Sequence, residues 1–269
     1  MRSIHVALVP DEIPESGLQH NQAVLVIDVL RASTTIITAL AAGAVCVVPV
    51  AEIEEANRMA ANIGTGALLG GERSGLRPTG FLLGNSPLEY TLQTVGGRTV
   101  VLTTTNGTYT LARCKGAGAI AVASFRNAAA SARWAGAQLA LGRELIVVCA
   151  GTRRRFTLED ACLAGLLTQL IQAGAEAAGA EVAGVNAAGA VGADAAGAVG
   201  ADAVLLSDGA QAAQLIWQGW KQDPVAVMHA SAHGQDLARM GFQVDLDFCA
   251  QVSVVDIVPQ LLNGRLQSV

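Results

Sequence analysis

The sequence predicts an α/β fold, a three-layer α/β/α arrangement with a largely parallel or mixed sheet. Short apolar segments, often β-branched, alternate along the chain with helix-like segments, as in sheets covered by helices on both faces. Hydrophobic residues make up 52% of the 269 residues and charged residues only 14%, which is enough for a large buried core. We therefore expect a single α/β domain over residues 1–269.

Each expected strand is a short apolar run, and the expected helices fill the intervals between the runs. The strands are Val6–Val9, Val24–Ile27, Val45–Val50, Thr99–Thr103, Ile120–Ala123 and Ile146–Cys149. The helices are Ser33–Ala42, Ile53–Ile63, Thr108–Cys114, Asn127–Leu141, Leu158–Ala173, one that begins near Ser207, and His233–Met240. Residues 64–94 predict loops with short elements, and the alternating pattern of Gly241–Phe248 predicts a loop or an edge strand.

A low-complexity insert rich in Ala and Gly covers about residues 173–203. The segment Ala-Ala-Gly-Ala-Val-Gly-Ala-Asp occurs at 187–194 and again at 195–202. Solenoid repeats need three or more units to bury a core. Two copies therefore indicate a local duplication in a surface loop, where extra length costs little entropy.

The composition argues against several classes of protein. A net charge of −5 leaves no basic footprint for nucleic acid. No apolar run approaches the roughly 20 residues that span a bilayer, and the N-terminal apolar run resembles a first strand rather than a signal peptide. The cysteines are scattered and mostly lie inside apolar runs, which favours buried free thiols in a cytoplasmic protein. They are Cys46, Cys114, Cys149, Cys162 and Cys249.

The same junction occurs three times: an apolar run ends in small, hydroxyl or charged residues and a helix-like stretch follows. The junctions are Val24–Thr35, Val100–Thr108 and Ile146–Thr152. Ligands bind outside the carboxyl ends of strands in open α/β sheets, and helix N-termini favour anions there. The three junctions therefore predict an anion site.

At the first junction, Asp28 could ligate Mg²⁺, and Arg31 could pair with a phosphate or carboxylate. The alternative is that Asp28 caps the following helix and Arg31 is its ion-pair partner. Ser33 and Thr34 are either anion contacts or capping hydroxyls.

Two further loops contain candidate residues. The Gly-rich loop Gly70–Gly75 carries Glu72 and Arg73, although many such loops are exposed turns with solvated charges. At the second junction, the hydroxyl-rich segment with Asn106, Gly107 and Thr108 could form an anion nest. Nucleotide-binding motifs are absent from the sequence, which favours a small phosphorylated or acidic ligand.

At the third junction, Cys149 and Arg155 have the Cys-x₅-Arg spacing of cysteine-dependent phosphatases. The simpler interpretation, which we favour, is a buried thiol at a strand end. Gly151 and Thr152 lie in the same loop. Glu159 and Asp160 then begin a helix, where acids suit the helix dipole but could also ligate Mg²⁺. His229 and His233 lack a metalloprotease motif, and of the two we expect His233 to approach a site.

Taken in order, these segments resemble the 2-phosphosulfolactate phosphatase (ComB-like) family. The matching residues are Val26–Thr35, Gly71–Arg73, Gly80-Phe81, Leu83–Pro87, Thr104–Thr108, Ser124-Phe125, Asn127-Ala128, Cys149–Thr152, Phe156, Leu158–Asp160, His233-Gly234, Gly241-Phe242, Asp245 and Pro259. The resemblance covers nearly the whole chain, and the Ala/Gly insert lies outside it. It implies an α/β fold and Mg²⁺-dependent hydrolysis of a phosphate monoester. For the named family member that ester is 2-phospho-3-sulfolactate, on the way to coenzyme M.

We therefore expect a cytoplasmic Mg²⁺-dependent phosphatase with a small phosphorylated acid as its substrate. The expected metal ligands are Asp28, Glu72, Glu159 and Asp160, and Asp28, Arg31, Glu159 and Asp160 are the expected catalytic residues. The expected substrate contacts are Ser33, Thr34, Arg73, Asn106, Gly107, Thr108, Gly151, Thr152 and Arg155, with Arg153 available for a second acidic group. A homodimer is a further expectation, and neither nucleic acid nor membrane is expected as a partner. The alternatives are a cysteine phosphatase that uses Cys149 and Arg155, or a small-anion-binding protein without turnover.

Overall fold

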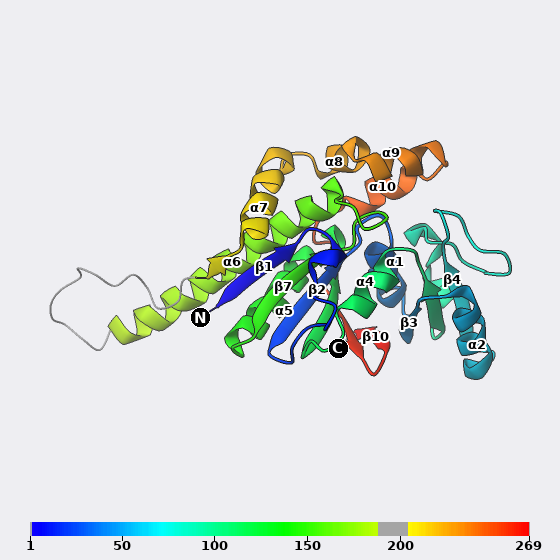
Figure 1. The fold of residues 1–269 in the computed structure, drawn as a ribbon, viewed down its shortest axis with the longest axis horizontal. Coiled ribbons are helices and arrows are strands. Elements are labelled where there is room, and N and C mark those ends of the chain that lie inside the picture. The colour runs from blue at the N-terminus through cyan, green and yellow to red at the C-terminus, as the bar shows by residue number, and fades with distance from the viewer. Residues whose placement is uncertain (1, 188–203, 269) are drawn as a thin grey trace.

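The computed structural model describes residues 2–187 and 204–268, and for residues 176–187 it describes the backbone alone. The described chain forms a ten-stranded mixed sheet with helices on both faces (Figure 1). This is a three-layer α/β/α fold, which confirms the predicted fold class.

The described elements follow the predicted alternation closely. The strands are β1 Ser3–Ala7, β2 Gln22–Ile27, β3 Cys46–Val50, β4 Ala67–Gly71, β5 Thr99–Thr103, β6 Ala119–Ala123, β7 Glu144–Cys149, β8 Leu205–Leu206, β9 Pro259–Leu262 and β10 Arg265–Ser268. The helices are α1 Ala32–Ala41, α2 Ile53–Ile63, α3 Leu92–Val95, α4 Gly107–Arg113, α5 Ala128–Ala140, α6 Leu158–Ala187, α7 Asp208–Trp220, α8 Pro224–Ala230, α9 Ala232–Arg239 and α10 Gln243–Cys249. Short 3₁₀ turns occur at Pro10–Glu12, Pro87–Glu89 and Phe125–Asn127.

The strand order is β4-β5-β3-β10-β9-β6-β2-β7-β1-β8. Strands β4, β5 and β3 pair in parallel, as do β6, β2, β7, β1 and β8. The β9–β10 hairpin joins the two groups through antiparallel pairs. Counted outward from the hairpin, the strand order is β10, β3, β5, β4 on one side and β9, β6, β2, β7 on the other. The two halves of the sheet therefore mirror each other, and the loops after β5 and β2 hold equivalent places in them. The loops after β4 and β7 are equivalent in the same sense.

Both faces of the central strands are buried, which explains their nearly continuous apolar sequences. Leu25 and Ile27 of β2 pack with α5, α6 and α7, whereas Val24 and Val26 pack with α1 and α4 on the other face. A smaller cluster packs α2 against β3 and β5. Successive β2 side chains thus serve opposite layers, as strand geometry requires.

Two expectations for the C-terminal half were wrong. Gln243–Cys249 is the helix α10, where the alternating sequence predicted a loop or an edge strand. Helix α6 extends to Ala187, where a loop was expected from residue 173. Apart from its first residue, the tandem duplication lies at 188–202, outside the described residues.

Helices α8, α9 and α10 gather along one edge of the molecule, next to the loops that carry the predicted site (Figure 1). None of the helices in the described part of the chain has both the length and the apolar character needed to cross a membrane.

Candidate active site

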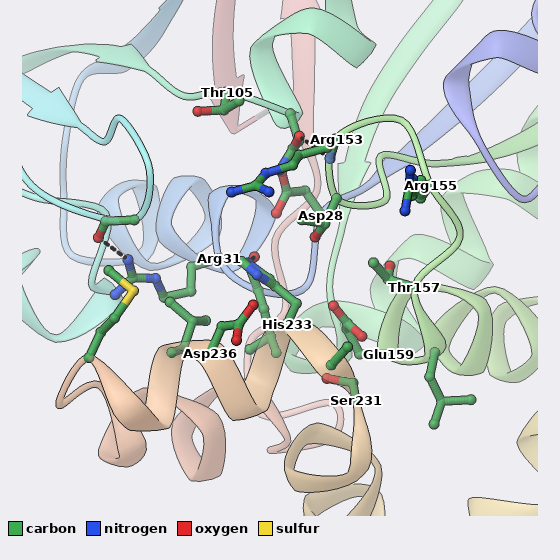
Figure 2. A pocket seen from close by; sticks show the side chains of 18 of the residues that line it. Asp28, Arg31, Thr105, Arg153, Arg155, Thr157, Glu159, Ser231, His233 and Asp236 are labelled. Carbon is green, nitrogen blue, oxygen red and sulfur yellow. Dashed lines mark hydrogen bonds between the residues drawn. The ribbon is translucent and has the colours of Figure 1, made fainter.

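A cavity of about 930 Å³ opens where the loops after β2, β4, β5 and β7 meet α9 (Figure 2). Each of these strands contributes a polar residue to its wall: Asp28, Glu72, Asn106 and Thr152. The predicted junctions therefore meet at one place. Helix α9 and the residue before it close the cavity from the opposite side with Ser231, His233 and Asp236.

Asp28 is a helix cap, as one interpretation of its sequence position predicts, and it also lies in the cavity wall. Its Oδ1 accepts a hydrogen bond from the Ala32 backbone N–H at 3.1 Å, at the start of α1. The Asp28 N–H donates to Ser33 Oγ at 2.7 Å, and Thr34 Oγ1 donates to the Val29 carbonyl at 2.9 Å. The two hydroxyls thus secure the turn around Asp28 and do not line the cavity.

The loop after β5 approaches Asp28 closely because residue 107 is glycine. A Cβ there would lie 2.9 Å from Asp28 Oδ2 and 2.7 Å from the Ala32 Cβ. Thr108 Oγ1 donates to the Thr104 carbonyl at 2.6 Å, so Thr108 binds its own loop. Asn106 lines the cavity, and its Oδ1 accepts the Arg153 N–H at 3.1 Å.

Glu72 connects the loops that follow β4 and β5. Its Oε1 accepts the Thr105 N–H and its Oε2 accepts the Gly75 N–H, both at 2.7 Å. The neighbouring Arg73 donates to the Ala51 carbonyl at 2.6 Å and to Thr103 Oγ1 at 2.9 Å. Glu72 is therefore a cavity residue, and Arg73 is directed elsewhere.

The loop after β7 turns tightly and presents exposed cations. The backbones of Thr152 and Arg155 exchange two hydrogen bonds of 3.0 Å, and Arg153 and Arg154 between them adopt positive φ angles of 52° and 61°. Arg153 and Arg155 line the cavity with exposed side chains, whereas Arg154 lies over the Tyr109 ring. The turn therefore places two cations beside the buried carboxylates.

Asp160 ties the loops after β2 and β7 together below the cavity. Its Oδ1 accepts the Val29 N–H and its Oδ2 accepts the Gly151 N–H, both at 2.9 Å. Burial raises the pKa of Asp160 to about 6, although these hydrogen bonds lower it.

Glu159 and Asp28 are buried carboxyl groups whose negative charge is disfavoured by burial and by the neighbouring carboxylate of Asp160. Burial, together with the charge of Asp160, raises the pKa of Glu159 to about 8 and holds the pKa of Asp28 well above its usual range. Among the described residues Glu159 Oε2 has no hydrogen-bond partner, although it is buried. Leaving such an atom unpaired is costly, so it indicates that a ligand or proton completes the site.

Arg31 lies in the cavity wall, but its donors are directed at protein groups. Nη1 forms a 2.7 Å ion pair with Asp245, and Nη2 donates to the Gly75 carbonyl at 3.0 Å. The guanidinium also lies 4.1 Å from the centroid of the Phe242 ring, and its side chain is only 2% exposed. Arg31 therefore joins α10 to the Glu72 loop, and its ion-pair partner is Asp245 rather than Asp28.

Cys149 does not fit a nucleophile. Its thiol is fully buried in the apolar core that the sheet forms with α5, α6 and α7. Burial together with the charge of Asp160 raises the pKa of this thiol well above the usual range. A catalytic thiol needs a lowered pKa and access to substrate. The cysteine-phosphatase alternative is therefore not favoured.

The structure divides the predicted site residues into two sets. In the cavity wall lie Asp28, Arg31, Glu72, Asn106, Thr152, Arg155 and Glu159. Outside the wall, in the turns that support it, lie Ser33, Thr34, Arg73, Gly107, Thr108, Gly151 and Asp160. Residues of the wall that sequence reasoning did not single out include Asn85, Thr105, Ser231 and Asp236.

Comparison of the sequence with known proteins shows which family the chain belongs to. The model of the 2-phosphosulpholactate phosphatase family matches residues 7–264. The chain belongs to this family. Its members are phosphoric monoester hydrolases, which agrees with a cavity that combines buried carboxylates and exposed arginines.

Several curated relatives have the same printed name, probable 2-phosphosulfolactate phosphatase. The chain is 37% identical to the one from Carboxydothermus hydrogenoformans over 265 residues, 98% of this chain and 95% of the relative. It is 38% identical to the one from Symbiobacterium thermophilum over 256 residues, 94% and 97% of the two chains. It is 37% identical to the one from Thermotoga petrophila over 240 residues, 89% of each.

Proposed function

We propose that this chain is a Mg²⁺-dependent phosphatase that hydrolyses 2-phospho-3-sulfolactate or a closely related phosphorylated hydroxy-acid. The observation that carries the proposal is the single cavity in which Asp28, Glu72 and Glu159 face the exposed cations Arg153 and Arg155. A substrate with a phosphate and further acidic groups needs both kinds of residue. The names of the relatives support the same substrate class.

The carboxylates fit Mg²⁺ as a partner shared with the substrate. Mg²⁺ is commonly held by one or two carboxylates, with water and phosphate oxygens completing its shell. No group of three His, Cys, Asp or Glu side chains in the described residues is arranged to hold a metal alone. Asp28 Oδ2 and the unpaired Glu159 Oε2 are the oxygens we assign to the cation, with Glu72 and Asp160 as supporting carboxylates. When bound, the cation would neutralise charge on the phosphoryl oxygens.

The remaining residues bind and orient the ester. We propose that Arg153 and Arg155 bind the carboxylate and sulfonate groups and that Asn106 and Thr152 orient the phosphoryl group. Arg31 acts as a positioning residue, because its donors hold Asp245 and Gly75. The attacking group is either water or a carboxylate. We further propose a cytoplasmic location, which the five buried, unpaired cysteines favour.

The test is phosphate release from a panel of phosphorylated hydroxy-acids, including 2-phosphosulfolactate, with Mg²⁺ and with EDTA. We expect turnover of 2-phosphosulfolactate that EDTA abolishes and Mg²⁺ restores. Binding without phosphate release would instead support the small-anion-binding alternative, and full activity in EDTA would refute the metal requirement.

Asp28→Asn should lower Mg²⁺-dependent turnover by at least about 100-fold, because the amide removes the charge that faces the cation and phosphate. The fold should persist, since an amide oxygen can still accept the Ala32 N–H. Circular dichroism and kcat measured at saturating Mg²⁺ check the two statements. Wild-type turnover in this variant would contradict the assignment.

A further inference from the structure

His233 stands out among the cavity residues because it is a histidine that the proposed reaction does not yet use. It projects from α9 toward the loop of Asp28 (Figure 2). Its Nε2 lies 2.9 Å from the Leu30 carbonyl oxygen. A carbonyl can only accept, so Nε2 carries the hydrogen and the lone pair of the neutral ring lies on Nδ1.

The surroundings keep this ring in its neutral form. Burial lowers the pKa of His233 below its usual range, and the charge of Arg31 lowers it further. The Leu30 carbonyl and the charges of Glu72 and Asp236 act in the opposite direction and are outweighed. Among the described residues Nδ1 has no hydrogen-bond partner. The cavity therefore contains a neutral ring nitrogen that is free to accept a proton.

Hydrolysis of a phosphate monoester needs such an acceptor, whichever group attacks phosphorus first. The oxygen of water must lose a proton, either when water attacks the ester or when it releases phosphate from a carboxylate. Both oxygens of Glu72 accept backbone N–H groups, as do both oxygens of Asp160. Asp236 forms a 2.6 Å ion pair with Arg239, and Asp28 and Glu159 are the carboxylates assigned to the cation. His233 is therefore the remaining candidate in the wall.

We propose that His233 is the general base of the reaction and takes a proton from the attacking water on Nδ1. This inference rests on the proposed function. When water attacks the ester directly, the bond from phosphorus to the leaving oxygen breaks as the new oxygen–phosphorus bond forms, and one water proton passes to Nδ1. When water instead releases phosphate from a carboxylate, the bond that breaks joins phosphorus to the carboxylate oxygen, and the water proton again passes to Nδ1. The departing alkoxide takes up a proton from solvent, and His233 returns its own proton to solvent before the next turnover. The products are inorganic phosphate and the free hydroxy-acid.

The test uses His233→Gln and His233→Ala in the full chain with 2-phosphosulfolactate. The amide of glutamine can still donate to the Leu30 carbonyl but has no basic nitrogen. We expect kcat of both variants to fall by about 100-fold or more, with KM changed less than about three-fold. Added imidazole should restore part of kcat in His233→Ala and none in His233→Gln, where the side chain fills the site.

His229→Gln is the matched control, since His229 lies on α8 and pairs with the exposed Asp247 outside the cavity wall. It should keep wild-type kcat. Thermal melting separates loss of fold from loss of chemistry, because imidazole cannot rescue an unfolded enzyme. Wild-type kcat in His233→Gln, or a loss of kcat in His233→Ala that imidazole leaves unchanged, would overturn the proposal. If the wild type released no phosphate, the proposed function itself would fail, which is a distinct result.

Discussion

At the scale of single residues, Asp28 could be placed at the site from sequence alone because a strand end is a local feature. Its position after an apolar run predicts both the cap and the cavity, and the structure contains both. Arg31 was assigned to phosphate for the same reason, but its partner Asp245 is 214 residues away. Nothing local to either residue marks that pair. His233 was singled out as a histidine near a site, but Ser231 and Asp236, which close the cavity beside it, were missed for the same physical reason.

Glu159 should make stability depend on pH in a direction that can be worked out from its pKa. Burial raises that pKa from 4.5 to about 8. Below pH 4.5 the carboxyl is protonated whether the chain is folded or unfolded. As pH rises toward 8, the unfolded chain loses this proton more readily, so the stability contribution is progressively lost. In the metal-free protein, the free energy of unfolding should fall on the order of 3 kcal/mol more in wild type than in Glu159→Gln over this range.

Urea unfolding at several pH values measures this difference. Glu54→Gln, on the exposed surface of α2, is the control and should keep the wild-type slope. If the free energy of unfolding changed with pH by the same amount in wild type and Glu159→Gln, Glu159 would not be a neutral buried acid.

At the scale of elements, periodicity predicted the buried strands and most helices but failed in the C-terminal region. Asp245, Leu246 and Cys249 are the buried residues of α10, a helical spacing. Because Asp245 is an acid, the sequence alternates polar and apolar residues there and mimics a strand. Strands β9 and β10 are short and pair with each other and with distant strands, so little in their own sequences marks them.

The approach of α4 to the first junction gives a prediction at the same scale. In Gly107→Ala the new Cβ would meet Asp28 Oδ2 and Ala32, which should cost about 1–3 kcal/mol of stability through overpacking. It should also lower kcat, because Asp28 is displaced. Gly136→Ala in α5 is the matched control, with nothing within 4 Å of its Cβ, and should stabilise by about 0.5–1 kcal/mol. Urea titration and phosphate release check both variants, and equal stability in the two would refute the close approach.

At the scale of the whole molecule, the site lies where two halves with mirrored strand orders meet. One half contributes Glu72 and Asn106, and the other contributes Asp28 and Thr152. The alternation of strands and helices predicted the layers, because each element needs an apolar face. It could not predict the mirrored order, because that order depends on which distant strands pair. The meeting of the loops was nevertheless predictable, since ligands in open α/β sheets bind outside the carboxyl ends of the strands.

The Arg31–Asp245 ion pair connects α10 to the loop after β4, because Arg31 also donates to the Gly75 carbonyl. Its loss should therefore lower the stability of both regions. Both side chains are nearly fully buried, at 2% and 3% exposed. Asp245→Ala would leave Arg31 buried without its partner and also remove the acceptor of the Ser86 hydroxyl. We expect a loss of about 3–5 kcal/mol, measured by urea unfolding.

Asp256→Ala is the control: it breaks the exposed Arg133–Asp256 pair and should cost no more than about 1 kcal/mol.

Hydrogen exchange shows whether the ion pair supports both regions or α10 alone. In Asp245→Ala, protection should fall in α10 and also at the Gly75 amide, because Arg31 links the two through the Gly75 carbonyl. Loss of protection confined to α10 would show that the C-terminal helices do not support the Glu72 loop.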